Sequence, residues 1–207
     1  MKILHIISSP AGENSFSINL GNAIVDKLKS EKLDSIVITR NLAAQPLPHY
    51  DAVHQSTLYT PIEEQTQEQL EVTNRSNEAI AELLEADVVV IGVPMYNYGI
   101  PSTLKSWIDY IARPGKTFAY SEAGPEGLVK GKTAYLAIST GGIYTSGQMK
   151  TWDHTENYLK TLLGDFFGMD VKAIRVEGTI FPGLKEDALD KAIQLFESIG
   201  KMFQGNP

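Results

Sequence analysis

Five short apolar runs alternate along the chain with stretches of helical periodicity. The runs, which predict strands, are Ile3–Ile7, Ser35–Thr39, Val88–Val93, Ala134–Ile138 and Val171–Val176. Several are almost continuous in Val, Ile and Leu, which is typical of strands covered on both faces. The stretches that predict helices are Ile18–Leu28, Leu70–Leu84, Leu104–Ile111, Tyr158–Phe167 and Ala188–Phe203. Five consecutive βα units predict an α/β fold with a parallel sheet and right-handed crossovers.

The number of strands distinguishes between the common doubly wound folds. Five strands fit the flavodoxin-like order 2-1-3-4-5, with helices on both faces, better than the six-stranded dinucleotide-binding order. At 207 residues, the chain is expected to form a single domain over residues 1–207. Three segments are expected to be long and irregular, and such loops are usually functional. They are Asn41–Pro61, Arg113–Lys132 and Thr140–His154.

Composition excludes several classes of function. A formal net charge of −7 argues against nucleic acid as a partner, because phosphate backbones select basic surfaces. The chain has no cysteine, which excludes disulfides, thiolate nucleophiles and cysteine-ligated metals. Any redox chemistry must therefore come from a bound cofactor.

Other features bear on membranes and metals. The apolar run at the amino terminus is too short for a signal peptide, and no run reaches the roughly 18 residues of a transmembrane helix, so a cytoplasmic protein is expected. The four histidines show no metal-ligand spacing, and no metal site is expected; they are His5, His49, His54 and His154. His5 lies within the first strand and is expected to be a core histidine with satisfied hydrogen bonds.

The loop after the first strand carries hydroxyl groups at the start of a helix. Ser8 and Ser9 end the strand, and the helix is expected to begin near Ser15-Phe16-Ser17. Free backbone N–H groups and the helix dipole make such a terminus an anion site, and a phosphate monoester fits it. Simple helix capping by serine explains the same residues. The position after a parallel strand favours the ligand site.

Two further loops follow the third and fourth strands. Pro94-Met95-Tyr96-Asn97-Tyr98 brings aromatic surface and an amide to the end of the third strand, which suits a flat heteroaromatic ring. A rigid loop that covers the end of the sheet is the alternative. Ser139-Thr140-Gly141-Gly142 ends the fourth strand, and its glycines let backbone amides approach a ligand; a flexible turn is the alternative.

The three loops follow strands that are neighbours in the flavodoxin-like order, so they predict one mononucleotide site. The motifs GxGxxG and GxSxG are absent, which argues against a Rossmann dinucleotide site and an α/β-hydrolase. Gly131-Lys132-Thr133 is similar to the end of a P-loop, but Glu126 stands where its first glycine is required.

With these loops the chain resembles the FMN-dependent NADH-azoreductase family of flavodoxin-like quinone and azo reductases. The segments that carry the resemblance are Ser8-Ser9, Ser15–Ser17, Leu42–Pro48, Pro94–Tyr98, Leu104-Lys105, Thr117-Phe118, Gly124–Leu128 and Ser139–Gly142. The resemblance implies an enzyme that binds FMN tightly but non-covalently and uses NADH or NADPH to reduce quinones and azo compounds by ping-pong hydride transfer. It also implies a homodimer.

The resemblance assigns roles to particular residues. The implied cofactor-binding residues are Ser9, Ser15, Phe16, Ser17, Pro94, Met95, Tyr96, Asn97, Tyr98, Ser139, Thr140, Gly141 and Gly142. No side chain is expected to be catalytic, because the flavin performs the hydride transfer. Asn97, Gly141 and Tyr120 are expected to support it, with Tyr120 near the partner subunit's flavin. Leu162 stands where the family often has an aromatic residue.

Three other functions fit part of the pattern. The first is an electron-carrier flavodoxin, which would form a stable one-electron-reduced flavin. The second is an α/β protein that binds another phosphate-bearing ligand, and the third is an interaction protein built on the same scaffold. The long loops favour a substrate-reducing enzyme over an electron carrier, and three ligand-type loops at one edge argue against an interaction protein. A colourless protein that gains no flavin on reconstitution would favour the other phosphate-bearing ligand.

Overall fold

A parallel sheet of five strands forms the centre of the molecule in the computed structural model, which describes residues 1–122 and 124–203. The strands are β1 (Lys2–Ile7), β2 (Ile36–Asn41), β3 (Val88–Pro94), β6 (Thr133–Ser139) and β7 (Asp170–Val176). Their spatial order is β2-β1-β3-β6-β7, and every pairing is parallel. Within this sheet the order is 2-1-3-4-5, which confirms the predicted flavodoxin-like fold.

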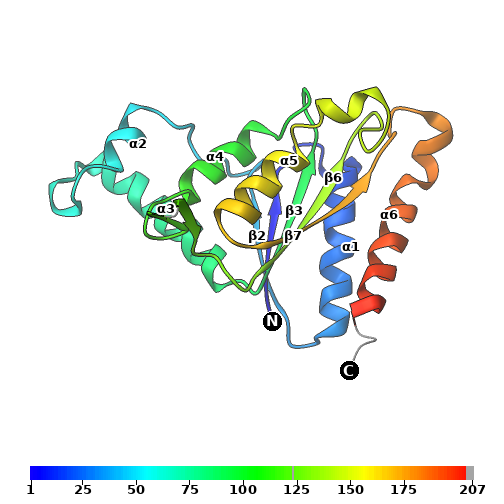
Figure 1. Ribbon diagram of the computed structural model, residues 1–207, viewed down its shortest axis with the longest axis horizontal. Coiled ribbons are helices and arrows are strands. Elements are labelled where there is room, and N and C mark those ends of the chain that lie inside the picture. The colour runs from blue at the N-terminus through cyan, green and yellow to red at the C-terminus, as the bar shows by residue number, and fades with distance from the viewer. Residues whose placement is uncertain (123, 204–207) are drawn as a thin grey trace.

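Helices cover both faces of the sheet (Figure 1). On one face lie α1 (Phe16–Glu31) and α6 (Pro182–Phe203); on the other lie α3 (Gln67–Glu85), α4 (Ser102–Ile111) and α5 (Glu156–Leu159). Successive residues of a strand point into opposite cores: Val89 and Ile91 pack in one hydrophobic cluster, and Val90 packs in the other. Two buried faces explain why the strands are continuous apolar runs.

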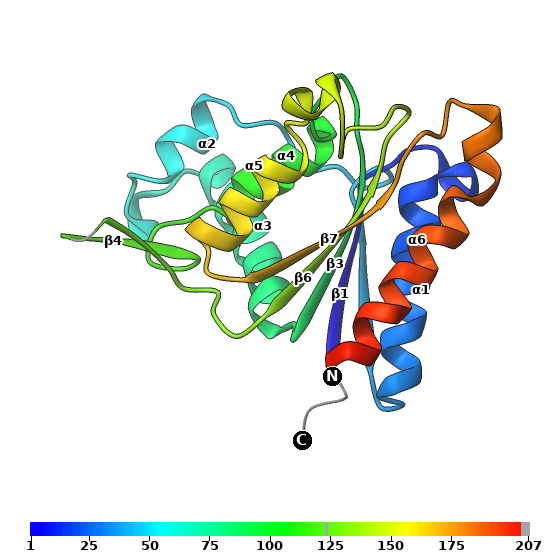
Figure 2. The ribbon, with the colours of Figure 1, turned by 45° about the vertical axis from the view of Figure 1, so that its right-hand side comes forward.

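Two elements lie within segments that the sequence predicted to be irregular. The first is the short helix α2 (Ala52–Thr57), and the second is an antiparallel hairpin of β4 (Phe118–Ser121) and β5 (Gly124–Gly127). The hairpin projects away from the sheet (Figure 2). The expectation of irregular structure is therefore wrong in part. Elements of four to six residues are too short to show periodicity, and glycine and proline in β5 obscure a strand signal.

Short helical turns complete the chain. Single 3₁₀ turns span Gly12–Asn14, Ile62–Glu64 and Gln148–Trp152. After α5 the helix continues as a π-helical segment, Lys160–Phe166, in which the Phe167 N–H donates to the Leu162 carbonyl at 2.9 Å. This segment falls within the predicted helix Tyr158–Phe167. Among the described residues, no helix has both the length and the hydropathy needed to cross a bilayer.

Candidate cofactor site

The three loops predicted to bind a ligand meet at the carboxyl edge of the sheet. Ile7 pairs with Gly92, and Pro94 pairs with Ser139, so β1, β3 and β6 end close together. Side-chain and backbone hydrogen bonds connect the loops. The Ser8 hydroxyl donates to the Gly92 carbonyl at 2.6 Å, and the Met95 N–H donates to the Ser139 carbonyl at 2.8 Å.

The serine loop forms the start of α1. Ser15 is the N-cap, and its Oγ accepts from the Ile18 N–H at 3.4 Å and lies 3.1 Å from the Ser17 Oγ. Ser9 Oγ accepts from the Ala11 N–H at 3.3 Å. Ser9, Ser15 and Ser17 are only 3%, 5% and 0% exposed, so their hydroxyl groups are buried within the loop and do not face solvent. Capping is thus one role of Ser15, and the helix amino terminus still offers the unpaired amides that bind anions.

The loop after β3 is a tight turn with strained backbone. The Tyr96 N–H donates to the Gly99 carbonyl and the Gly99 N–H to the Tyr96 carbonyl, both at 3.0 Å. Asn97 and Tyr98 have φ angles of 49° and 68°, which makes this a type I′ turn. Left-handed conformations of non-glycine residues cost about 1–3 kcal/mol each and concentrate at functional sites. The turn leaves Tyr96 and Tyr98 about half-exposed at the edge of the sheet.

The glycine pair after β6 is held by its carbonyl groups. The Gly141 carbonyl accepts from the Ile180 N–H at 3.2 Å, and the Gly142 carbonyl accepts from the Gly178 N–H at 3.1 Å. Within the described part of the chain, neither glycine's own N–H donates a hydrogen bond. Both N–H groups can therefore donate to a ligand at the end of β6.

Two aromatic residues that the sequence did not single out pack around Tyr98. The ring of Trp152 lies 5.6 Å from the Tyr98 ring and that of Tyr144 lies 6.3 Å from it, both edge to face. We call Tyr98, Tyr144 and Trp152 the aromatic wall. Trp152 and Tyr98 remain about half-exposed, so the wall presents apolar surface beside the candidate site.

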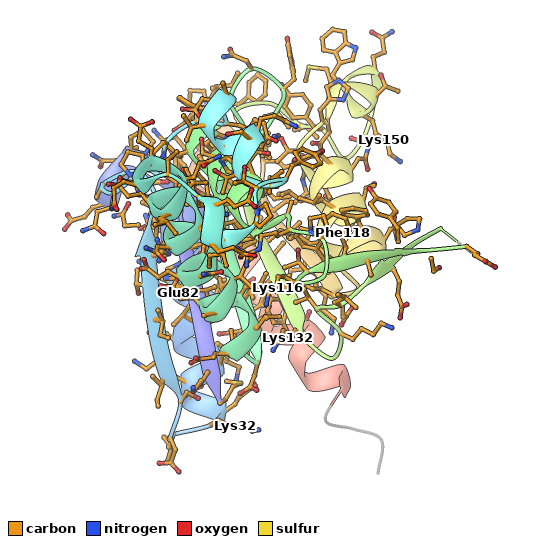
Figure 3. All side chains as sticks on the ribbon, turned by 90° about the vertical axis from the view of Figure 1, so that its left-hand side faces the viewer. Lys32, Glu82, Lys116, Phe118, Lys132 and Lys150 are labelled. Carbon is orange, nitrogen blue, oxygen red and sulfur yellow. The ribbon has the colours of Figure 1, made fainter. Side chains whose placement is uncertain are left out.

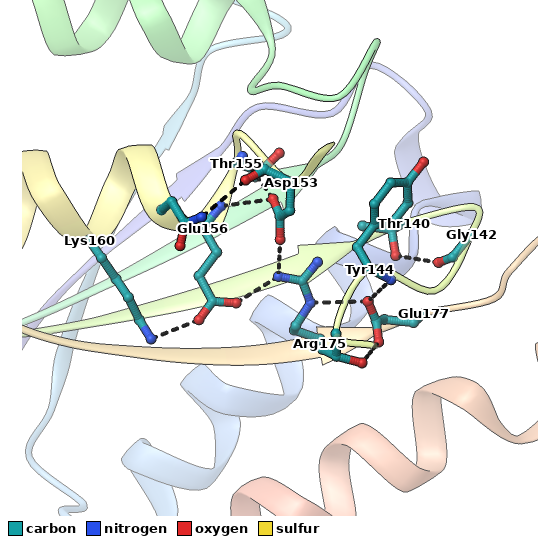
Figure 4. Close-up of polar contacts among 11 residues, drawn as sticks. Thr140, Gly142, Tyr144, Asp153, Thr155, Glu156, Lys160, Arg175 and Glu177 are labelled. Atoms are coloured by element: carbon teal, nitrogen blue, oxygen red, sulfur yellow. Dashed lines mark hydrogen bonds and ion pairs between the residues drawn. The ribbon is translucent and has the colours of Figure 1, made fainter. Parts of the chain in front are cut away.

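A buried ionic network that the sequence also did not reveal lies next to Tyr144 of this wall (Figure 4). Arg175 Nη1 contacts Asp153 Oδ2 at 2.7 Å and Glu156 Oε2 at 2.6 Å, and its Nε lies 3.3 Å from Glu177 Oε1. Burial alone would lower the pKa of Arg175, but these three carboxylates raise it above its ordinary value. Burial would raise the pKa of Glu156, yet hydrogen bonds from Lys160 and Arg175 hold it below its usual value.

Several residues considered from the sequence lie away from the three loops. Arg113 donates to Ser76 and Asn77 of α3, at 3.0 and 2.7 Å. Lys132, of the P-loop-like sequence, lies near the amino edge, whereas Lys150 lies at the carboxyl edge (Figure 3). Lys132 Nζ donates to the carbonyls of Leu84 and Ala86, which is a structural role.

Three other residues singled out in the sequence lie on the hairpin, in the π-helical segment and in β1. Tyr120 is 72% exposed on the hairpin, and Leu162 packs partly buried against the core in the π-helical segment. His5 is buried as expected, but its Nε2 has no hydrogen-bond partner among the described residues, so the expectation of satisfied hydrogen bonds is wrong for that nitrogen. Burial lowers the pKa of His5, so the neutral ring is favoured.

A well-formed cavity lies elsewhere in the molecule. It has a volume of about 270 Å³, and its lining includes His54, Tyr110 and Arg113 from the region of α2 and α4. The free glycine N–H groups and the strained turn lie at the three loops and not at this cavity.

Comparison with known proteins gives the family. Residues 1–199 match the model of a family described as having a flavodoxin-like fold. An FMN-dependent NADH:quinone oxidoreductase from Mesorhizobium japonicum is 43% identical over 194 residues, which cover 93% of this chain and 90% of the relative. One from Herminiimonas arsenicoxydans is 44% identical over 178 residues, 86% of this chain and 87% of the relative. The chain belongs to the family of FMN-dependent NADH:quinone oxidoreductases.

Solved structures of this family share the whole architecture. An azoreductase from Bacillus anthracis strain Sterne matches with a TM-score of 0.89 and 26% identity, covering 96% of this chain and 98% of that one. An FMN-dependent NADH-azoreductase from Bacillus anthracis strain Ames Ancestor, solved in complex with FMN, matches with a TM-score of 0.87 and 27% identity over 98% of this chain and 99% of that one. The resemblance seen in the sequence is confirmed.

Proposed function

We propose that this protein binds FMN at the carboxyl edge of its sheet and uses NADH to reduce quinones and azo compounds. The observation that carries the proposal is the meeting of three ligand-type loops at one edge, where the N–H groups of Gly141 and Gly142 donate to no group within the described residues. Relatives that share more than 40% identity over most of the chain are named FMN-dependent NADH:quinone oxidoreductases, and solved structures of the same architecture are named azoreductases.

The residues at this edge fit FMN. The amino terminus of α1, with Ser9, Ser15, Phe16 and Ser17, is suited to the phosphate. The turn of Pro94–Tyr98 and the segment Ser139–Gly142 flank the place where the ring would lie. Bound FMN supplies hydride transfer, which the side chains of a cysteine-free protein cannot provide.

The chain itself contributes position and electrostatics. The N–H groups of Gly141 and Gly142 share peptide planes with the carbonyls of Thr140 and Gly141, which accept from the Thr179 N–H at 3.3 Å and the Ile180 N–H at 3.2 Å. These N–H groups are therefore held in place and would stabilise negative charge on the pyrimidine edge of the ring without reorganising. Asn97 adds an amide at the tip of the strained turn. We propose that NADH and the acceptor occupy the same place in turn, which is a ping-pong scheme.

The names of the relatives favour NADH over NADPH as the co-substrate. An additional 2′-phosphate needs a nearby cation. Arg113 is directed at Ser76 and Asn77 of α3, whereas Lys150 lies at the carboxyl edge (Figure 3). A kinetic comparison tests the preference: kcat/KM for NADH should exceed that for NADPH.

We also propose that the active protein is a homodimer. Tyr120 on the hairpin and Tyr59 and Ile62 after α2 are 72%, 79% and 62% exposed. The hairpin and α2 project on the same side of the molecule, on the left in Figures 1 and 2. Exposed apolar side chains gathered on one side are typical of an interface. Sedimentation of the purified protein should give twice the mass of the chain.

The deciding experiment is an absorption spectrum of the purified protein before and after anaerobic NADH, with the released chromophore identified. A flavin spectrum that bleaches in one two-electron step, with FMN released on denaturation, is expected. A stable one-electron-reduced form would favour an electron carrier. A protein that takes up no FMN on incubation would refute the proposal.

A further inference from the structure

We propose that Arg175 is a positioning residue, which sets the place of the aromatic wall and thereby the affinity for the electron acceptor. The inference rests on the proposed function, since it assumes that the acceptor binds beside this wall. Arg175 does not itself reach the loops predicted to bind FMN. It acts through the three carboxylates that surround it.

Each member of the aromatic wall is attached to this network or to a residue next to it. Glu177 Oε1 accepts from the Tyr144 N–H at 2.8 Å, and Glu177 Oε2 accepts from the Thr145 hydroxyl at 2.6 Å. Asp153, which directly follows Trp152, is bound to Arg175 at 2.7 Å. The next residue, His154, donates its N–H to the Tyr98 carbonyl at 3.0 Å. Arg175 is therefore linked, through its carboxylates, to the backbone at or next to each of the three aromatic residues.

The network also joins the wall to the sheet. Arg175 pairs with Ile138 in β7 and β6, one residue before Ser139 begins the glycine segment. Asp153 Oδ1 accepts from the N–H groups of Thr155 and Glu156 at 2.8 and 3.2 Å, so the same carboxylate starts α5. Strand, loop and helix thus share one ionic centre, seen in Figure 4.

Stability alone explains this network poorly. The side chains of Arg175 and Asp153 are each 9% exposed, and that of Glu177 is 15% exposed. Desolvation of buried charges often offsets their attraction, so apolar residues of similar size commonly stabilise a fold at least as much as a buried ion pair does. An ionic centre also fixes one geometry for the groups bound to it. The loop that carries the aromatic wall needs such a fixed geometry if the wall is to face the substrate.

The test compares Arg175→Met and Arg175→Lys with Arg40→Met as the matched control. Arg40 is similarly buried and is bound to Glu82 and Glu78, at 2.6 and 2.7 Å, but it connects β2 to α3 and touches no loop of the site. For Arg175→Met we expect the KM for a bulky quinone to rise about tenfold with kcat changed less than about threefold, as for loss of substrate positioning. Arg175→Lys should restore part of the affinity, and Arg40→Met should leave KM unchanged.

A second readout does not depend on turnover. Trp107 is fully buried and Trp152 is 49% exposed, so acrylamide quenching of tryptophan emission reports on Trp152. Quenching should increase by up to about twofold in Arg175→Met, because the loop loses its attachment, and should not change in Arg40→Met.

Unchanged quenching and unchanged KM in Arg175→Met would overturn the inference, as would an equal change in Arg40→Met. If Arg175→Met does not fold, Glu177→Gln, which leaves Arg175 bound to Asp153 and Glu156, decides by the same two readouts. Failure of the unsubstituted protein to bind FMN would refute the proposed function. The quenching comparison would still decide whether Arg175 sets the wall.

Discussion

Replacing Gly127 with alanine should detach the hairpin from the body of the protein. A Cβ at this position would lie 2.3 Å from the carbonyl carbon of Phe167, 2.4 Å from its oxygen and 2.5 Å from the nitrogen of Gly168. All three are backbone atoms, so no side chain can rotate away. Ordinary contact begins at about 3.4 Å, so the hairpin must retreat by about 1 Å.

The cost of that movement follows from what the hairpin loses. Overpacking of this kind costs about 1–3 kcal/mol. The hydrogen bond from the Val129 N–H to the Phe167 carbonyl, 2.8 Å long, adds about 1 kcal/mol if it breaks. Phe118, which pairs with Gly127 and whose ring lies 4.3 Å from that of Phe166, would move too. We expect the free energy of unfolding of Gly127→Ala to fall by about 2–4 kcal/mol.

Urea unfolding at one fixed protein concentration measures the effect. Gly183→Ala is the matched control, because a Cβ there meets nothing within 4 Å and the residue lies in the first turn of α6. Alanine in place of a helical glycine should raise stability by about 0.5–1 kcal/mol. Equal urea midpoints for Gly127→Ala and the unsubstituted protein would show that the hairpin is not held by this contact.

Three further predictions concern the cap, a buried histidine and the glycine pair. Ser15→Ala should lower the free energy of unfolding by about 1 kcal/mol and also weaken the retention of FMN. Thr66→Ala, which removes the cap of α3, should lower the free energy of unfolding alone. Dialysis against limiting FMN distinguishes the two variants. Burial lowers the pKa of His54 below 6.5 despite Asp109 and Asp51, so as the pH falls below about 6.5 the unfolded chain takes up the proton first and stability is lost. His54→Phe, which keeps a ring in contact with Tyr50 and Tyr110, should flatten this decline, and an unchanged difference between urea midpoints at pH 7.5 and 5.5 would contradict it. Gly141→Val should weaken FMN affinity about tenfold or more, because a branched side chain next to this amide would crowd the approach of the ligand; the contact that its Cβ would make with Ile180 Cγ2, at 3.0 Å, is with an exposed side chain that can move. Unaltered binding and NADH-driven bleaching would exclude a role for this amide.

Much of the fold and the place of the site follow from local patterns. Strands such as Val88–Pro94 are continuous apolar runs because both faces of the sheet are covered, and that pattern is visible in a single sequence. Ser15 is recognisable as a cap from its position before an amphipathic stretch. Once the strand order was predicted, the meeting of the three loops followed from topology.

Other features depend on contacts between distant residues. Arg175 and Asp153 are 22 positions apart and share no local signature, so the network behind the aromatic wall was not predicted. The pairing of Tyr98 with Trp152 spans still more of the chain. Gly127 stands in a segment that carries the family resemblance, but only the structure shows that its missing side chain admits the backbone of Phe167.

The turn at Tyr96–Gly99 is closed by hydrogen bonds of its own backbone. Its two reciprocal hydrogen bonds and two left-handed residues leave the backbone little freedom to lose, so the entropy of ordering this loop is lost on folding and not on binding. Cofactor uptake then needs no slow rearrangement of this segment, and its rate should be governed by encounter. Because both the protein, at −7, and a phosphate monoester are anionic, added salt should accelerate that encounter, the reverse of what oppositely charged partners show.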